Sequence, residues 1–131
     1  MLNFLAVFST MTAILLWSVT AASALPLVVI KSCYDGDTCH TNNGEKIRLA
    51  CIDAPELRGT RANPMPAKAS RDYLRSLVVG ERVGIRRITT DRYGRTIAEL
   101  FIGGSNIQQM LVAEGAAKIY WRYAHQCRWT R

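Results

Sequence analysis

No charged side chain precedes Lys31 in this 131-residue sequence. The stretch from Leu2 to Ala24 is apolar or small throughout and ends in Ala-Ser-Ala. An apolar segment followed by small residues is typical of a secretory signal peptide. We therefore expect residues 1–24 to be a signal peptide. Residues 25–131 are then one secreted or periplasmic domain, with no stable membrane association after cleavage.

The same segment has a second interpretation, an uncleaved membrane anchor. About 20 apolar residues can span a bilayer, and the segment has no Lys or Arg at its start, where a signal peptide normally carries one. Hydroxyl side chains between Ser9 and Thr20 reduce its hydrophobicity. This dilution favours the signal peptide over the anchor.

Histidine is scarce and no Cys-x-x-Cys pair occurs, so the sequence does not predict a zinc site. The four cysteines are Cys33, Cys39, Cys51 and Cys127. In an oxidising compartment they can form up to two disulfides in any of three connectivities. Cys51, which lies in an apolar run, can equally remain a buried thiol. We expect His40 and His125 at the surface, without a role as ligand or base.

Acidic side chains are outnumbered. The chain has 10 Asp and Glu against 17 Lys and Arg, for a formal net charge of +7 and a pI of about 9.6. A basic excess favours a polyanionic partner, because Lys and Arg displace counterions from phosphate backbones. Many exported proteins are basic for other reasons, so charge alone does not establish nucleic-acid binding.

Apolar residues make up 49% of the chain, and the four prolines and nine glycines are scattered among apolar runs, as in one compact domain. These runs predict five strands, bounded by Asp-Gly, Asn-Gly, Pro or Gly turn signals. The predicted strands are Leu27–Tyr34, Thr38–Thr41, Ile47–Ile52, Arg82–Ile88 and Thr96–Ile102. The first three are expected to form an antiparallel meander.

Two helices complete the predicted fold. Helical periodicity covers Ala67–Val79, with Gly80 as the stop. Ser105, with Gln108 three residues later, resembles a capping box that opens a second helix ending at Gly115. Five strands with one helix between the third and fourth is the order of a five-stranded OB-type barrel in the α+β class.

Three short motifs occur in order along this framework: Asp35-Gly36-Asp37-Thr38, then Arg48 followed by Ile52-Asp53-Ala54-Pro55-Glu56, then Asp91-Arg92-Tyr93-Gly94-Arg95. Together they resemble the staphylococcal nuclease (thermonuclease) family, from about Val28 to about Tyr123. Any one motif is modestly specific, since Asp-Gly-Asp is a common turn, but all three in order at this spacing are highly specific.

The resemblance implies a calcium-dependent endonuclease that hydrolyses DNA and RNA and leaves 3′-phosphate ends. By position, Asp37, Asp53 and the backbone carbonyl of Ala54 would hold calcium. Glu56 would orient or deprotonate the attacking water, and Arg48 and Arg95 would hold the scissile phosphate. The family often has threonine where this chain has Ala54, so a hydroxyl is lost while the carbonyl remains.

The resemblance also implies contacts to the rest of the nucleotide. Arg92 and Tyr93 would touch phosphate and sugar, while Trp121 and Tyr123 would line the base pocket. Stacking on aromatic rings tolerates any base, so the sequence does not predict a base preference. We expect the domain to act as a monomer.

The chemistry suits these residue types independently of the resemblance. Phosphodiester hydrolysis needs a positioned water, a base, and cations that offset the charge on the equatorial oxygens. Calcium takes oxygen ligands from carboxylates, carbonyls and water. Arginine can donate two hydrogen bonds to one phosphate, which lysine does less well.

One geometric difficulty concerns Arg48 and Asp53. Residues five apart on a regular strand point to opposite faces, so these two should not meet. A bend or bulge between Ala50 and Ile52, or the end of the strand before Pro55, must bring them together.

Less specific interpretations remain for each charged residue. Asp35 and Asp37 can simply shape a turn, Arg48 and Asp53 can be a structural ion pair, and Arg92 and Arg95 can be solvated turn residues. At the level of the whole chain, the alternatives are an OB-type module that binds nucleic acid without cutting it and a basic envelope protein. Because every carboxylate that hydrolysis needs is present, we rank the nuclease first.

The chain after Tyr123 is short. Members of the family usually continue into a third helix, whereas only Ala124–Arg131 follow here, too few for a stable multi-turn helix alone. We expect this helix to be missing and the domain to be marginally stable, unless Cys127 tethers the tail to the barrel.

Overall fold

The computed structural model of the chain describes residue 18 and residues 24–131. Most of the predicted signal peptide, and with it the choice between signal peptide and membrane anchor, therefore lies outside the described residues. Within the described part, no helix combines the length and the apolar character needed to cross a membrane.

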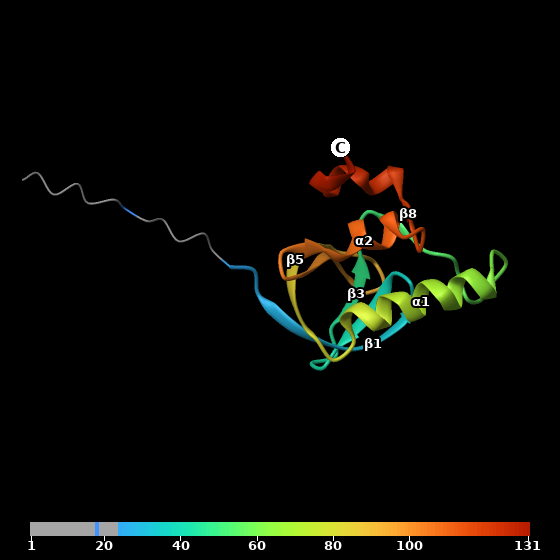
Figure 1. The fold of residues 1–131 in the computed structure, drawn as a ribbon, viewed down its shortest axis with the longest axis horizontal. Helices are drawn as coiled ribbons and strands as arrows, with labels where there is room; N and C mark the ends of the chain where they lie inside the picture. The colour runs from blue at the N-terminus through green and yellow to red at the C-terminus, as the bar shows by residue number, and fades with distance from the viewer. Residues whose placement is uncertain (1–17, 19–23) are drawn as a thin grey trace, which may run out of the picture.

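Five strands curl into a closed barrel (Figure 1). They are β1 (Leu27–Asp35), β2 (Thr38–Thr41), β3 (Lys46–Leu49), β5 (Arg82–Thr90) and β6 (Thr96–Ile102). Neighbours pair antiparallel in the order β3-β2-β1-β5-β6, and a parallel pairing between β3 and β6 closes the ring. The predicted meander and the five-stranded OB-type barrel are both confirmed.

The barrel interior is filled by the inward-facing side chains of these strands. The fully buried strand residues include Ile30, Ile47, Leu49, Val83 and Leu100. On β5 the buried positions alternate with more exposed ones near the start of the strand, as period-two patterning requires. The apolar runs that predicted the strands are therefore also the source of the core.

Helix α1 (Pro64–Val78) packs against the barrel through a stripe made of Ala67, Ser70, Leu74 and Val78. It begins three residues before the predicted start, because proline is tolerated in the first turn, where its missing N–H has no intrahelical partner. Figure 1 shows α1 lying along the barrel next to β1.

Helix α2 (Ile107–Ala113) begins after the short strand β7 (Ser105–Asn106), and the predicted capping box is wrong. The cap is Asn106, whose Oδ1 accepts the Gln109 N–H at 3.0 Å. The Gln108 side chain is instead fully buried: its oxygen accepts the Leu100 N–H at 3.1 Å and its nitrogen donates to the Ala98 carbonyl at 2.9 Å. Gln108 lies three residues after Ser105, as in a capping box, but its side chain belongs to the core.

The predicted strand Ile47–Ile52 is wrong as one continuous element. It divides into β3, which ends at Leu49, and the two-residue strand β4 (Ile52–Asp53). Between them Cys51 has a φ of 67°, the only positive φ of a described non-glycine residue. Strand β4 leaves the barrel and pairs antiparallel with β8 (Lys118–Ile119).

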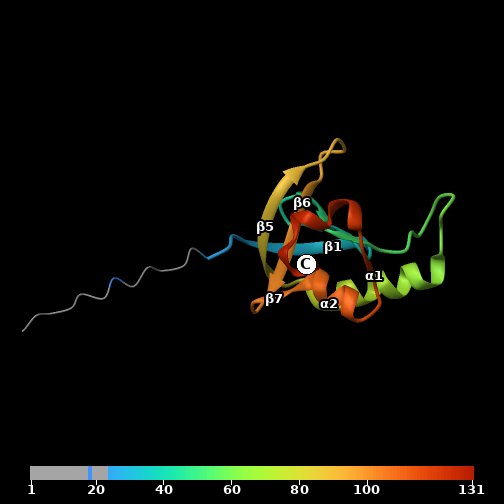
Figure 2. The ribbon, with the colours of Figure 1, turned by 90° about the horizontal axis from the view of Figure 1, so that it is seen from above.

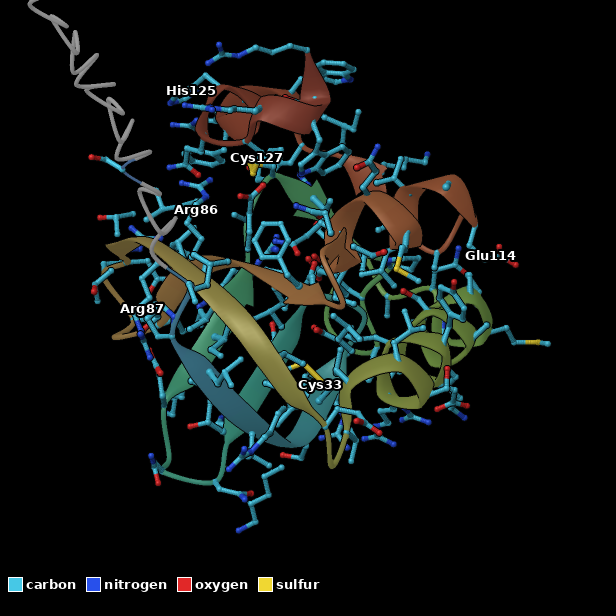
Figure 3. The ribbon with its side chains drawn as sticks, turned by 60° about the vertical axis from the view of Figure 1, so that its left-hand side comes forward. Cys33, Arg86, Arg87, Glu114, His125 and Cys127 are labelled. Carbon is cyan, nitrogen blue, oxygen red and sulfur yellow. A yellow bond between two sulfur atoms is a disulfide. The ribbon has the colours of Figure 1, made fainter. Side chains whose placement is uncertain are left out.

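The tail after β8 consists of two short 3-10 turns, η1 (Trp121–Gln126) and η2 (Arg128–Thr130), and the described residues contain no third α-helix. A disulfide joins Cys51 to Cys127 and holds the tail against the barrel (Figure 3). Cys51 is therefore not a free thiol, and the tether that the sequence left open is present. The second disulfide joins Cys33 to Cys39 across β1 and β2.

Candidate functional site

The break between β3 and β4 brings Arg48 and Asp53 to the same place. Nη2 of Arg48 lies 3.8 Å from Oδ1 of Asp53 and 3.4 Å from Oδ2 of Asp37. The left-handed backbone at Cys51 supplies the half-turn that a regular strand lacks. The bend expected between Ala50 and Ile52 is thus present, and one guanidinium faces two carboxylates.

Asp37 is positioned by the turn that joins β1 to β2. Its backbone N–H donates to Asp35 Oδ1 at 3.1 Å, and its own Oδ2 accepts the Ala54 N–H at 2.9 Å. Gly36 packs so closely on α1 that an added Cβ would lie 1.9 Å from Ser70 Oγ and 2.7 Å from Ala54 Cβ. Only glycine fits there, so the turn is held against both the helix and the segment that carries Ala54.

The electrostatic state of Asp37 follows from its burial. The residue is only 5% exposed. Loss of hydration raises the pKa of Asp37 to about 7; the Arg48 guanidinium opposes this shift and the Asp35 carboxylate adds to it. One arginine therefore does not fully compensate the ionised carboxylate, and a second cation at this position would stabilise it.

The donors at this position suit a hard cation. Asp37 and Asp53 supply carboxylate oxygens, and Ala54, which directly follows Asp53, adds the backbone carbonyl expected from the sequence; such a set of oxygens fits calcium better than a metal with softer preferences. Among the described residues no group of three His, Cys, Asp or Glu side chains is arranged to hold a metal. Calcium here would therefore need water or substrate oxygens to complete its shell.

Glu56 lies just beyond these residues on the loop between β4 and α1. Its backbone carbonyl accepts the Asn63 N–H at 2.9 Å, and it forms a backbone bridge with Ala62, so the loop is closed at its base. The side chain is exposed. Figure 2 shows this loop extending away from the barrel beside the start of α1. The structure therefore shows an exposed carboxylate three residues after Asp53 in the sequence, available to solvent, but no direct contact between Glu56 and the two aspartates.

A pocket of about 670 Å³ opens on the other side of Arg48. Its lining includes Arg48, Arg92, Tyr93, Arg95 and Tyr123, all predicted from the sequence. Trp121 is not part of the lining and is 71% exposed. The structure therefore places five of the predicted residues around one cavity and Trp121 outside it.

Two arginines of this pocket, Arg92 and Arg95, come from the turn between β5 and β6. The Asp91 carboxylate accepts the N–H groups of Tyr93 and Arg95, each at 2.9 Å, and Nε of Arg95 at 2.8 Å. Partial burial works against ionisation, but these hydrogen bonds outweigh it and lower the pKa of Asp91. The guanidinium carbons of Arg92 and Arg95 lie 4.9 and 5.4 Å from the Tyr93 ring centroid. Asp91 therefore organises the turn and leaves further N–H groups of both arginines for a ligand.

The tail contributes three lining residues that were not predicted, namely Tyr120, Arg122 and Gln126. The rings of Tyr120 and Tyr123 meet edge to face, with centroids 5.1 Å apart, and the Arg122 guanidinium carbon lies 5.5 Å from the Tyr123 ring centroid. The alternation of aromatic and basic residues after Ile119 is the signal that could have found them. Tyr120 also donates its backbone N–H to the Cys51 carbonyl at 2.8 Å, which fixes the tail beside the strand break.

The two histidines lie apart from this chemistry. His125 is exposed on η1, and His40 is half-buried on β2. In the part of the chain that the structure describes, neither belongs to a group able to hold a metal.

Comparison with known proteins relates the chain to nucleases. A family model described as staphylococcal nuclease homologue matches residues 46–130. An uncharacterized endonuclease of Escherichia coli is 37% identical over 93 residues, which cover 68% of this chain and 58% of the relative. An uncharacterized endonuclease of Haemophilus influenzae is 38% identical over 95 residues, covering 70% and 51%.

A thermonuclease of Staphylococcus intermedius is 29% identical over 96 residues, which cover 69% of this chain and 57% of that protein. The chain spans about half the length of the curated relatives it matches.

Proposed function

The chain belongs to the staphylococcal nuclease family, and from that membership we propose that it is a calcium-dependent endonuclease. It hydrolyses phosphodiester bonds in DNA and RNA and leaves 3′-phosphate ends. Relatives named endonuclease and thermonuclease support the reaction class. The metal, the product ends and the substrates are part of the proposal.

One observation carries the proposal. A single guanidinium nitrogen of Arg48 lies within 4 Å of both Asp37 and Asp53, on the wall of a cavity lined by two further predicted arginines. A phosphate bound to Arg48 in that cavity would lie close to the two carboxylates that the same guanidinium faces, although these carboxylates do not line the cavity. Because a phosphate cannot approach two carboxylates without a cation between them, this arrangement favours a divalent metal.

In the proposed mechanism, Arg48 and Arg95 bind the equatorial oxygens of the scissile phosphate through their planar forks. Glu56 accepts a hydrogen bond from the attacking water and takes its proton as the water oxygen bonds to phosphorus. The P–O5′ bond breaks, and the leaving 5′ oxygen takes up a proton from solvent. Asp37, Asp53 and the Ala54 carbonyl would hold calcium, which supplies positive charge against the phosphate as negative charge builds in the transition state. Tyr93, Arg92 and Tyr123 hold the neighbouring nucleotide.

We also propose that the domain is exported. The support is the apolar segment up to Ala24 together with two disulfides that pair all four cysteines. Disulfides persist in oxidising compartments and are rare in the cytosol. The domain is proposed to act as a monomer outside the cytoplasm.

The decisive experiment is cleavage of supercoiled plasmid and of RNA by the purified mature domain, with calcium and with a chelator. Cleavage of both substrates in calcium and none in chelator is the expected result. Magnesium should support little turnover, because it requires a tighter octahedron and gives up water reluctantly. The product ends are checked by polymerase extension, which should require prior phosphatase treatment.

One outcome would overturn the proposed activity, and a second would overturn only its calcium dependence. Tight binding of single-stranded DNA without cleavage in any divalent metal would favour the alternative, a non-hydrolysing OB-type module. Equal turnover in magnesium alone would remove the specific role of calcium while leaving the nuclease.

A further inference from the structure

A second pocket, of about 1030 Å³, lies between the tail and the barrel, and we call it the tail pocket. Its lining includes Arg86, Glu99, His125, Arg128, Trp129 and Arg131. These residues come from β5, β6, the two 3-10 turns and the residue that follows the second turn. None of them is among the site residues predicted from the sequence.

The tail pocket carries an excess of positive charge. Glu99 is the acidic residue of its lining, is only 4% exposed, and already accepts Nε of Arg86 at 2.6 Å and Nδ2 of Asn106 at 3.2 Å. Arg128 is exposed, and no carboxylate of the described residues forms an ion pair with it. The exposed surface of the pocket therefore attracts anions.

Arg86 links the pocket floor to the tail. Its Nη2 donates to the Gln126 carbonyl at 2.7 Å, so the Glu99 and Gln126 contacts use two of its five N–H groups. The side chain is 40% exposed. Figure 3 shows Arg86 rising from the barrel toward the tail near Cys127 and His125, with Glu114 lying apart from them. The guanidinium is thus held in place and keeps donors for an anion.

The tail pocket and the pocket beside Arg48 share a wall. Gln126 lines both cavities, and η1 carries Tyr123 on the side of the first and His125 on the side of the second. A ligand that leaves the first cavity over η1 therefore reaches the second directly. A polymer with regularly spaced negative charges can occupy both at once.

We propose that the tail pocket binds backbone phosphates of the same polynucleotide whose scissile phosphate lies beside Arg48. The inference rests on the proposed function and extends it by making the preferred substrate a strand long enough to occupy both pockets, several nucleotides in length. Charge complementarity and the shared wall favour a nucleic-acid strand over an acidic protein, because one continuous ligand then satisfies both pockets. Grooves of this kind track a phosphate backbone without reading bases.

The test compares Arg128→Glu with the matched charge reversal Arg82→Glu. Arg82 is exposed at the start of β5 and lines neither of the two pockets. Substrates are single-stranded DNA of about 20 nucleotides and a trinucleotide with the same scissile step. Arg128→Glu should raise the ratio of KM for the long strand to KM for the trinucleotide by roughly tenfold, whereas Arg82→Glu should leave that ratio near the wild-type value.

A binding measurement keeps the test independent of catalysis. In chelator, the affinity for the long strand should fall in Arg128→Glu, and the slope of log Kd against log salt should flatten by about 0.7, one phosphate contact on a single strand. The proposed role of the tail pocket would be overturned if both variants lost the same affinity for the long strand, or if Arg128→Glu raised KM equally for the long and short substrates. If the wild type cuts neither substrate, the proposed function fails, while this binding comparison still decides the pocket.

Discussion

The site has two sides that meet at Arg48 and are held in different ways. The carboxylate side consists of Asp37, Asp53 and Glu56, and the arginine-aromatic side consists of Arg92, Tyr93, Arg95 and Tyr123. Asp37 is buried, its turn packs on Ser70, and the Cys33–Cys39 disulfide spans that turn. On the other side, Tyr93 is 64% exposed on a turn that Asp91 organises. Figure 2 shows this β5–β6 turn projecting beyond the barrel.

This difference matches what each side has to do. A metal and a water must be held closely for turnover, whereas a nucleotide pocket can adjust to its ligand. We therefore expect changes on the carboxylate side to affect turnover and stability. Changes on the arginine-aromatic side should mainly affect binding.

The largest effect is expected from Glu56→Gln, which keeps the shape of the side chain but removes the base. Turnover should fall by roughly 10²- to 10⁴-fold, the usual range for loss of a general base. The affinity for a nucleoside 3′,5′-bisphosphate should change little, because Glu56 is exposed and outside the pocket lining. Single-turnover kinetics and calorimetry measure the two quantities.

The matched control is Glu114→Gln, at the exposed end of α2. It makes the same chemical change away from the site and should retain wild-type turnover. Near wild-type cleavage by Glu56→Gln would remove this residue from the mechanism.

The two disulfides offer a second way to sharpen the comparison. Cys51 and Cys127 are 76 residues apart in sequence, whereas Cys33 and Cys39 are 6 apart. Loop-closure entropy then predicts that replacing Cys51 and Cys127 by alanine lowers the free energy of unfolding by about 4 kcal/mol. Replacing Cys33 and Cys39 should lower it by about 2 kcal/mol. Denaturant titration without reductant measures both.

The disulfide variants should also differ in function. Loss of the Cys51–Cys127 bond frees the tail, which carries Tyr123 and Gln126 of the pocket wall, so KM should rise. Loss of the Cys33–Cys39 bond loosens the turn that carries Asp37, so the calcium requirement should rise instead. The same kinetic change in both variants would show that the two sides are not held independently.

A third prediction concerns pH in the metal-free protein. The pKa of Asp37 is about 7 in the folded chain against an ordinary value of 3.8, so the folded state binds this proton more tightly than the unfolded state does. The stability that this proton contributes is fully present below pH 4 and is lost as the pH rises through 7. Melting curves in chelator should therefore show a falling midpoint over this range.

The control for the pH prediction is Asp37→Asn, which cannot ionise. Its melting midpoint should vary less between pH 4 and 7 than that of the wild type. An unchanged slope in the variant would assign the pH dependence to other groups.

The smallest effect is expected on the arginine-aromatic side. Tyr123 lines the pocket beside Arg48 and Trp121 does not, although the sequence pattern placed both in it. Tyr123→Ala should weaken binding of the bisphosphate by about 1–3 kcal/mol, the usual contribution of one stacked base. Trp121→Ala should change it by less, and calorimetry of both variants decides. A larger loss in Trp121→Ala would favour the arrangement that the sequence suggested.

The barrel and most of the candidate residues could be predicted because their signals are local. Alternating apolar runs and turn residues mark where strands begin and end, and five strands in this order have few ways to close. The motifs around Asp37, Arg48 and Arg95 are short stretches whose residue types suit phosphate and calcium chemistry. These features depend on neighbours in sequence.

What the sequence could not determine involves contacts between distant segments. Strand β4, which follows the break at Cys51, pairs with β8 near the end of the chain. Cys51 bonds to Cys127, 76 residues away, and the Gln108 side chain reaches the Ala50 carbonyl, 58 residues away. Gln108 had the spacing of a cap, yet its side-chain nitrogen donates to the carbonyls of Ala50 and Ala98 in the core. A buried polar group must find its partners wherever the packed chain places them, and that is why only the tertiary structure decided these features.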